Sequence, residues 1–343
     1  MFGKLMNSYY YGKSGKGDYR KEDLPRTRWQ LFWEMLRVRF AGLIRLNLLY
    51  MLVWMPTMIV LLVGVMSVMS SMPGEEPVIA DPAAVVEEGV LPPAEEAVGE
   101  EADAVEVVEL TWDEWRAVSQ SVLLMTLLLL IPCITITGPF TAGLSYVTRN
   151  WARDEHAFAW SDFIDAVKAN WKPSLAVSFI TSVMPLIMYI CGTYYGELAE
   201  TNAIMAIPQA LSIMLGVLWS LAVTYAYPMI VSYDMRLRDV LRNSFLLAIG
   251  RLPMSVGVRL LHCIPVAIAL LVGMINMIWA MLGLMAYYML LGFGMSRFVT
   301  ASYTNAAFDR FINSRIEGAV VNRGLNTEPD DDEDDEDEDA EQE

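Results

Sequence analysis

The chain has 343 residues, of which 24 are Lys or Arg and 41 are Asp or Glu, so its formal net charge is −17. Hydrophobic residues nevertheless make up 55% of the chain, and the mean hydropathy is +0.37. This composition excludes an acidic disordered protein, and it is too apolar for an ordinary soluble domain. The charged residues must therefore be separated from the apolar ones along the chain.

Five long stretches contain no Asp, Glu, Lys or Arg. A hydrocarbon core about 30 Å thick needs about 20 apolar residues in a helix, and the stretches have 29, 32, 24, 33 and 37 residues: Leu46–Gly74, Ala117–Thr148, Pro173–Gly196, Thr201–Tyr233 and Leu260–Ser296. The last suits two helices, because apolar residues continue on both sides of it, and the turn falls at Asn276, Gly283 or the Gly292-Phe293-Gly294 run. We therefore predict an all-α polytopic membrane helical bundle with six transmembrane helices.

Lys and Arg residues fall almost entirely on one side of these six spans. Ten precede the first span, four lie in residues 149–172, five in 234–259, and four from Arg297 onward. The loop after the first span has one, Arg116. Cytoplasmic loops carry an excess of such residues. We therefore expect a multi-pass protein with both termini in the cytoplasm.

The segments outside the spans differ in composition. Residues 1–24 are polar, and residues 25–45 place aromatic and aliphatic side chains at helical spacing, which predicts an amphipathic interfacial helix. The membrane domain covers residues 46–312. It is interrupted by residues 73–114, which hold 14 acidic residues, and it is followed by residues 313–343, whose last 14 residues include 12 acids. Such runs predict a disordered extracytoplasmic loop and a disordered tail.

Two loops, 149–172 and 234–251, carry apolar residues at helical spacing. We predict a short interfacial helix in each loop, and together they form a cytoplasmic shelf that suits a partner subunit. In the second loop, the residues expected to face inward are Leu237, Val240, Leu241, Phe245 and Leu246.

Polar groups inside the spans are functional candidates, because an ionisable group in hydrocarbon must be paired or face water. Arg259 and His262 stand one turn apart near the start of the fifth span, where both can also reach the headgroups. Arg297 stands well inside the last span on a polar face, so we expect it to meet a carboxylate, backbone carbonyls or an anionic ligand. Asn47 is a further candidate, although single amides often only hold helices together.

Signatures of membrane enzymes are missing from the sequence. It has no H-E-x-x-H zinc motif, no P-loop and no G-x-S-x-G motif, and its two histidines are 106 positions apart. We therefore expect no enzymatic activity, no cofactor, no metal site and no nucleic-acid partner.

Two stretches resemble the YesL-like family of bacterial membrane proteins of unknown function. They are WEMLRVRFAGLIRLNLLYMLVWMP from Trp33 and IPCITITGPFTAGLSYVTRNWARDEHAFAWSDFIDAVKANWK from Ile131. The resemblance implies six helices and an accessory role in sugar uptake, because relatives often neighbour carbohydrate-uptake genes. The family pattern falls on Asn47, Gly138, Pro139, Thr141, Tyr146, Arg149, Arg153, Glu155, Asp162 and Phe163.

The leading hypothesis is a non-enzymatic accessory or regulatory component of carbohydrate uptake in the bacterial cell membrane, which contacts the lipid bilayer and, through its cytoplasmic loops, transporter subunits. The alternative is a small transporter or channel. A transport path requires polar residues from several helices at one depth, whereas a scaffold needs only an apolar outer groove. The candidate binding residues are Arg297, Arg259, His262, Asn47, Arg149, Arg153, Glu155 and Asp162.

Overall fold

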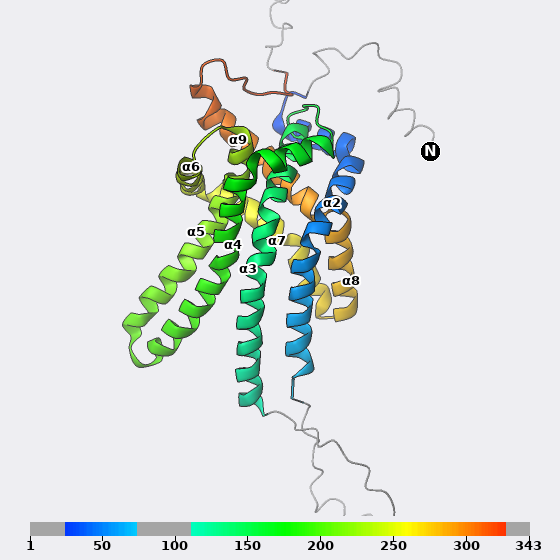
Figure 1. The fold of residues 1–343 in the computed structure, drawn as a ribbon. Coiled ribbons are helices and arrows are strands. Elements are labelled where there is room, and N and C mark those ends of the chain that lie inside the picture. The colour runs from blue at the N-terminus through cyan, green and yellow to red at the C-terminus, as the bar shows by residue number, and fades with distance from the viewer. Residues whose placement is uncertain (1–24, 74–110, 327–343) are drawn as a thin grey trace, which may run out of the picture. The chain divides into compact units, whose positions relative to one another are not determined.

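The computed structural model describes residues 25–73 and 111–326, and the regular secondary structure within these ranges is entirely helical (Figure 1). Six helices in these ranges are long and apolar enough to cross a membrane. The predicted all-α, six-span membrane fold is therefore confirmed. The spans are α2 (Arg28–Ser70), α3 (Trp112–Trp151), α4 (Ser161–Thr201), η2 with α5 (Ala203–Met205 and Ala206–Ser232), α7 (Leu252–Gly273) and the composite helix Met277–Arg315.

The chain divides into two compact units, of which the smaller is Thr57–Leu130. This unit holds the end of α2 and the start of α3, which pack closely. A Cβ atom at Gly64 would lie 2.6 Å from Oγ1 of Thr126, and Nε1 of Trp115 donates to the Val68 carbonyl at 3.3 Å. The two helix segments are therefore in direct contact within this unit.

The first turn of α3 corrects one boundary of the predicted acidic loop, 73–114. Thr111 and Glu114 form a reciprocal cap: the Thr111 N–H donates to the Glu114 carboxylate at 3.0 Å, and the Glu114 N–H donates to Oγ1 of Thr111 at 3.4 Å. Residues 112–114 are therefore helical. The rest of the loop, 74–110, and the N-terminal segment 1–24 lie outside the described residues.

The larger unit comprises Met1–Pro56 and Ile131–Glu343. Its N-terminal part shows that the predicted interfacial helix over 25–45 is not a separate element, because α2 continues from Arg28 into the first span without a break. Leu31, Met35 and Leu43 are buried, whereas Trp29 and Trp33 are exposed.

The prediction of a separate interfacial helix within 149–172 is wrong. Only residues 152–160 separate α3 from α4, and α4 runs from Ser161 through Pro173 without interruption. Its first turns pack along α3 because glycines on α3 allow close approach. A Cβ atom at Gly143 would lie 2.8 Å from the Phe163 carbonyl oxygen, and the Phe163 side chain is fully buried.

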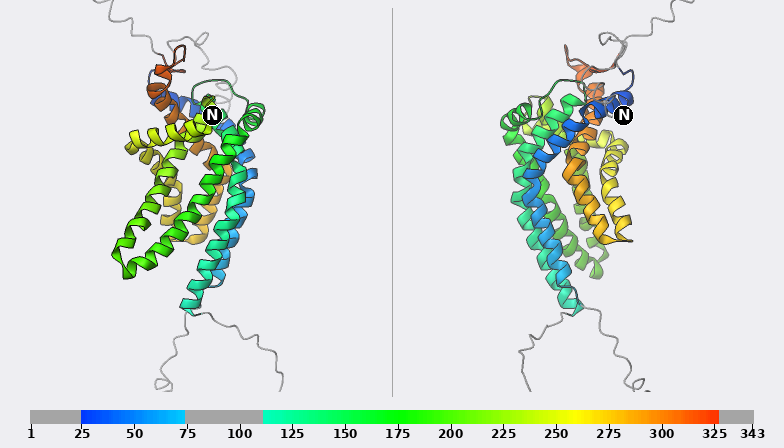
Figure 2. Two further views of the ribbon diagram at one scale, coloured as in Figure 1. Left: turned by 60° about the vertical axis from the view of Figure 1, so that its left-hand side comes forward. Right: turned by 90° about the vertical axis from the view of Figure 1, so that its right-hand side faces the viewer.

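The predicted basic helix in 234–251 is present as α6 (Leu237–Gly250), which runs across the end of α5 (Figure 2). Val240, Ser244 and Ala248 form its buried face. The prediction that Leu246 faces inward is wrong, since its side chain is 58% exposed.

The last two spans meet at Asn276, one of the three predicted turn positions. The Asn276 side chain caps α8 (Met277–Tyr287) by accepting the Trp279 N–H at 3.1 Å. A π-helical turn, η3 (Tyr288–Gly292), then leads into α9 (Phe293–Phe311) and the short helix η4 (Asn313–Arg315). The final span is therefore an α-helix with a π-turn inside it.

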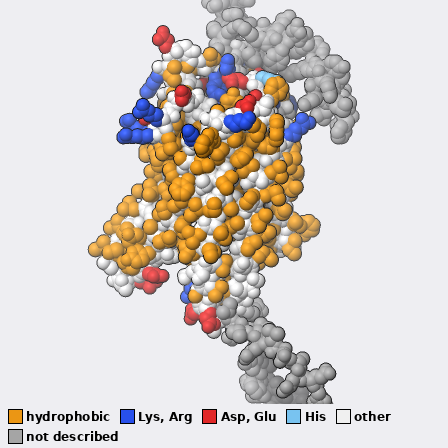
Figure 3. All heavy atoms as spheres, in the orientation of Figure 1, with side chains coloured by type: hydrophobic (Ala, Val, Ile, Leu, Met, Phe, Trp, Pro, Cys, Tyr) orange, Lys and Arg blue, Asp and Glu red, His pale blue; other side chains and the backbone are white. Residues whose placement is uncertain are grey.

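Hydrophobic side chains cover the sides of the larger unit, and Lys and Arg gather at one end (Figure 3). We call this the basic end; it is formed by residues 25–27, 152–160 and 233–236, by α6, and by residues 316–326, which we call the C-terminal strap.

The strap corrects the predicted disordered tail, 313–343. Residues 313–326 are folded against the protein, and the Asn326 N–H donates to the Pro25 carbonyl at 3.1 Å. Residues 327–343 lie outside the described ranges.

Candidate functional site

Two adjoining cavities lie among the membrane-spanning helices of the larger unit. Their volumes are about 550 Å³ and about 170 Å³. Four side chains line both cavities and therefore form the boundary between them: Tyr50, Trp54, Arg259 and Arg297. The boundary thus places two cations beside two aromatic rings, and these four residues come from α2, α7 and α9.

Polar side chains from several helices line these cavities. The larger cavity has hydroxyl groups from α3, α4 and α5, and the smaller has polar groups from α5, α7 and α9. They belong to Thr137, Thr141, Ser178, Thr181, Ser220 and Tyr227 in the first case, and to Thr224, His262, Ser296 and Thr300 in the second. Several helices therefore contribute polar groups to these two cavities.

Arg297 projects from α9, whose polar face points into the bundle as predicted. Its guanidinium carbon lies 5.1 Å from the centre of the Tyr227 ring, which is a cation–π contact. Among the described residues no carboxylate pairs with Arg297, and none lines either cavity. The Tyr227 ring is therefore the partner that the structure shows for this guanidinium group.

Arg259 and His262 also point toward the cavities. Arg259 donates to the Ser220 carbonyl of α5, and its buried Nε has no hydrogen-bond partner among the described residues. Nε2 of His262 lies 3.1 Å from the Ser296 carbonyl oxygen and 3.5 Å from Oγ1 of Thr300. Both side chains therefore face neighbouring helices and the cavities they enclose.

Asn47 lines neither cavity. Its side chain is fully buried and bonds to the backbone of the last span. Its amide nitrogen donates to the carbonyls of Tyr288 at 3.0 Å and Met289 at 2.8 Å, and its oxygen accepts the Gly294 N–H at 2.9 Å. Asn47 is therefore a positioning residue that holds the π-turn.

Tyr50 and Trp54 were missed by the sequence reasoning. Tyr50 follows Asn47 by one helical turn in the L-N-L-L-Y motif, and its hydroxyl lies 2.6 Å from Oγ1 of Thr141. The sequence feature that could have indicated Tyr50 is its spacing. An aromatic residue three positions after Asn47 lies on the same face of the helix as Asn47.

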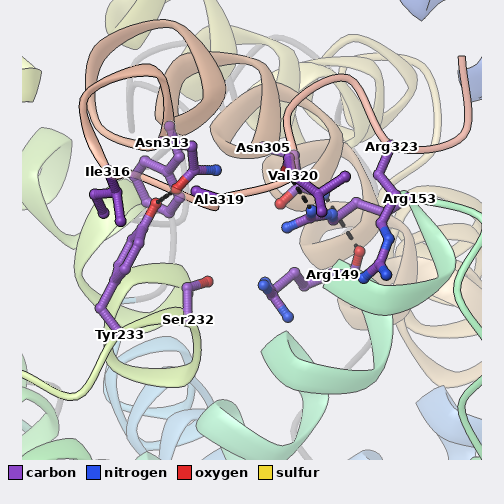
Figure 4. A pocket seen from close by; sticks show the side chains of 11 residues that line it. Arg149, Arg153, Ser232, Tyr233, Asn305, Asn313, Ile316, Ala319, Val320 and Arg323 are labelled. Carbon is purple, nitrogen blue, oxygen red and sulfur yellow. Dashed lines mark hydrogen bonds between the residues drawn. The ribbon is translucent and has the colours of Figure 1, made fainter.

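Arg149 and Arg153 line a different pocket, of about 310 Å³, at the basic end (Figure 4). Glu155 lies 3.5 Å from Nε of Arg153 and also pairs with Arg323. Asp162 lines neither this pocket nor the two intramembrane cavities. Its carboxylate accepts the Phe158 N–H at 2.8 Å and so holds the chain where it enters α4.

A second buried network at the basic end was also missed. Asp309 pairs with Arg28 at 2.7 Å, accepts from Nδ2 of Asn313 at 2.6 Å, and accepts the Asn322 N–H at 3.2 Å. Only Asn313 is a local partner, four positions after Asp309; Arg28 lies 281 positions before it and Asn322 lies 13 after it, so no local sequence pattern indicates the whole network. It ties the start of α2, the end of α9 and the C-terminal strap together.

No group of three or more His, Cys, Asp or Glu residues in the described part of the chain stands close enough to hold a metal ion. The site is instead built from guanidinium, hydroxyl and aromatic groups.

Comparisons with known proteins place part of the chain in a family context. Residues 118–190 match a family described as "Protein of unknown function, DUF624". The chain is also 26% identical over 127 residues to an uncharacterized protein, YesV, of Bacillus subtilis (strain 168); the match covers 37% of this chain and 60% of that protein. No solved structure matches. The chain is therefore similar to proteins of unknown function, and the matched residues 118–190 include the α3 and α4 side of the larger cavity.

Proposed function

We propose that the protein is a small multi-pass transporter, without enzymatic activity, that binds an organic anion in the cavities beside Arg259 and Arg297. The observation that carries this proposal is the placement of two arginines on the boundary of both cavities, with no carboxylate among the lining residues. Two like charges repel each other, and a low-dielectric surrounding strengthens that repulsion. An anion bound between the two arginines offsets this repulsion.

The lining also limits the kind of molecule that carries the negative charge. Arginine binds carboxylate and phosphate groups in a bidentate manner. The hydroxyl groups on α3, α4 and α5 suit a hydroxylated body, and Trp54 and Trp219 offer aromatic faces to a ring. A volume of about 550 Å³ for the larger cavity is within the usual range for small-molecule sites. We therefore propose an anionic, hydroxylated, ring-sized ligand.

The orientation in the membrane is part of the proposal. The basic end exposes five arginines, Arg26, Arg236, Arg238, Arg242 and Arg323, and the positive-inside rule places such an end in the cytoplasm. We propose that both termini are cytoplasmic and that the protein lies in the bacterial cell membrane. Membership of the YesL-like group is proposed on the stretches quoted above.

Equilibrium binding tests the proposal. The protein is placed in nanodiscs of neutral lipid, and calorimetry compares a sugar acid such as glucuronate with glucose, a matched pair that differs in charge. We expect saturable binding of the acid alone. Arg297→Gln should weaken it about tenfold to a hundredfold, the usual effect of losing a hydrogen bond to a charged group.

The matched control is Arg310→Gln, because Arg310 is an exposed arginine on the same helix that does not line the cavities. This control should bind as the wild type does. Equal binding of the neutral and acidic sugars, or equal weakening by both substitutions, contradicts an anion site at Arg297.

A second candidate function is the accessory role in carbohydrate uptake, and the surface of α6 favours it. Arg238 and Arg242 are exposed on this helix, next to Leu246 and Ile249, which are 58% and 56% exposed. Affinity purification in mild detergent tests it. Stoichiometric recovery of sugar-transporter subunits that is lost in the Arg238→Ala, Arg242→Ala variant supports the accessory role, and recovery of the protein alone contradicts it.

A further inference from the structure

The pocket at the basic end is separate from the intramembrane cavities and has a composition of its own. It lies between the end of α3, the end of α5, α9 and the C-terminal strap (Figure 4). Its polar lining is dominated by three guanidinium groups and by phenol and amide groups: Arg149, Arg153, Arg323, Tyr233, Asn305 and Asn313.

The positive charge in this pocket exceeds the negative charge near it. Glu155 is the carboxylate that pairs with both Arg153 and Arg323, so three cations face one anion. Asp309, whose partner Asn313 lines the pocket, is already paired with Arg28. The local excess is therefore about two positive charges.

Arg149 is the least satisfied of the three cations. Its Nη1 donates to the side chain of the neighbouring Asn150 at 3.0 Å, and its buried Nε has no partner in the described part of the chain. Figure 4 shows its guanidinium group directed into the open space facing Ser232. The group is thus oriented toward the position that a ligand would occupy.

The opposite wall of the pocket is held in place by the C-terminal strap. Gly324 has φ +81°, a conformation that favours glycine, and a Cβ atom there would lie 3.0 Å from the Arg153 carbonyl oxygen. Nη2 of Arg153 lies 3.4 Å from the Val320 carbonyl. These contacts keep Arg323 beside Arg153, so the three guanidinium groups are arranged before any ligand binds.

We propose that this pocket binds a phosphate group, either from a soluble phosphomonoester or from the headgroup of an anionic lipid. Phosphate offers two negative charges and several acceptor oxygens, which match guanidinium donors in bidentate geometry. The proposal is independent of the intramembrane site, because the two sets of lining residues have no member in common.

The test uses the full chain in nanodiscs. In the first arm the discs are neutral, and inorganic phosphate is titrated by calorimetry, with chloride at matched ionic strength as the reference. In the second arm phosphatidate is added to the discs, and the midpoint of thermal unfolding is followed. Arg149→Gln and Arg323→Gln are compared with Arg238→Gln, an exposed substitution of the same charge at the same end.

Saturable phosphate binding that falls at least tenfold in Arg149→Gln and Arg323→Gln, but not in Arg238→Gln, supports a soluble phosphate ligand. Stabilisation by phosphatidate alone, lost in the same two variants, supports a lipid headgroup. The proposal is overturned if the phosphate titration gives no more binding than the chloride titration and phosphatidate stabilises all variants equally. Should Arg149→Gln fail to fold, Arg323→Gln decides the outcome, because the Arg323 side chain is 52% exposed.

Discussion

The side-chain oxygen of Asn47 on α2 accepts a hydrogen bond from the backbone N–H of Gly294, 247 positions later, at 2.9 Å. The same side chain donates to two carbonyls of the η3 region. A π-turn interrupts the regular backbone bonding of an α-helix, and Asn47 supplies partners where the last span changes its register. The first and last spans are thereby fixed to each other just before α9 presents Arg297.

Asn47→Leu should therefore destabilise the protein strongly. The substitution leaves two carbonyls and one N–H of the last span without their partner, and each buried unsatisfied group costs about 1–3 kcal/mol. Thermal unfolding in mild detergent measures the effect. Asn170→Leu is the matched control, because within the described ranges the Asn170 amide bonds only to the Ala166 carbonyl of its own helix; a loss of equal size in both variants would contradict the role of Asn47.

Gly138→Ala should disrupt the packing of α4 on α3. A Cβ atom at this position would meet the Ser174 carbonyl oxygen and would lie 2.6 Å from Cβ of Ser178. Overpacking of this kind costs about 1–3 kcal/mol. Gly192→Ala, on α4, meets nothing within 4 Å and should leave stability unchanged or raised, since alanine favours helix. Unfolding midpoints that are lowered equally by both substitutions would be inconsistent with close packing at Gly138.

Asp309→Asn should destabilise the basic end, because it leaves Arg28 without its carboxylate. The Asp309 side chain is 7% exposed and that of Arg28 is 30% exposed, and losing a hydrogen bond to a charged group costs about 1.5–3 kcal/mol. Asp165→Asn breaks a pair with Lys168 in which both side chains are more than 70% exposed, so its effect should be below about 1 kcal/mol. Chemical denaturation followed by tryptophan fluorescence compares the two, and similar losses would contradict this account.

Tyr233 should give stability a dependence on alkaline pH. Burial raises the pKa of Tyr233 to about 12, above the unfolded value of about 10. Its contribution to stability is therefore fully present below pH about 10 and is lost as the pH rises through about 12. The difference in unfolding free energy between the wild type and Tyr233→Phe should be constant from pH 7 to 9 and shrink above pH 10. A difference that stays constant up to pH 12 would contradict a raised pKa.

The sequence was sufficient to predict the six spans, because hydrocarbon excludes charge and each span must be long and apolar. It also indicated Arg259, His262 and Arg297, since charged groups in a span are costly and therefore conspicuous. The apolar spacing of α6 also indicated that this helix packs against the core, although the Leu246 side chain is exposed.

Other features depend on contacts that no local pattern specifies. The first turns of α4 were predicted from their apolar spacing to form a short interfacial helix, whereas close approach at the glycines of α3 packs this stretch along α3. Asp309 was not among the predicted site residues, and its partner Arg28 is 281 positions away. Tyr50 and Trp54 were not among the predicted site residues, because their place beside the cavities depends on how α2 packs against α9.

Uptake by proteoliposomes tests the central claim most directly. The purified protein is reconstituted in neutral lipid, and entry of a radiolabelled sugar acid is compared with entry of the neutral parent sugar. The account predicts saturable uptake of the acid in the wild type and in Arg310→Gln, and little uptake in Arg297→Gln. Uptake that is absent in the wild type, or is equal in all three proteins, would contradict transport of an anion past Arg297.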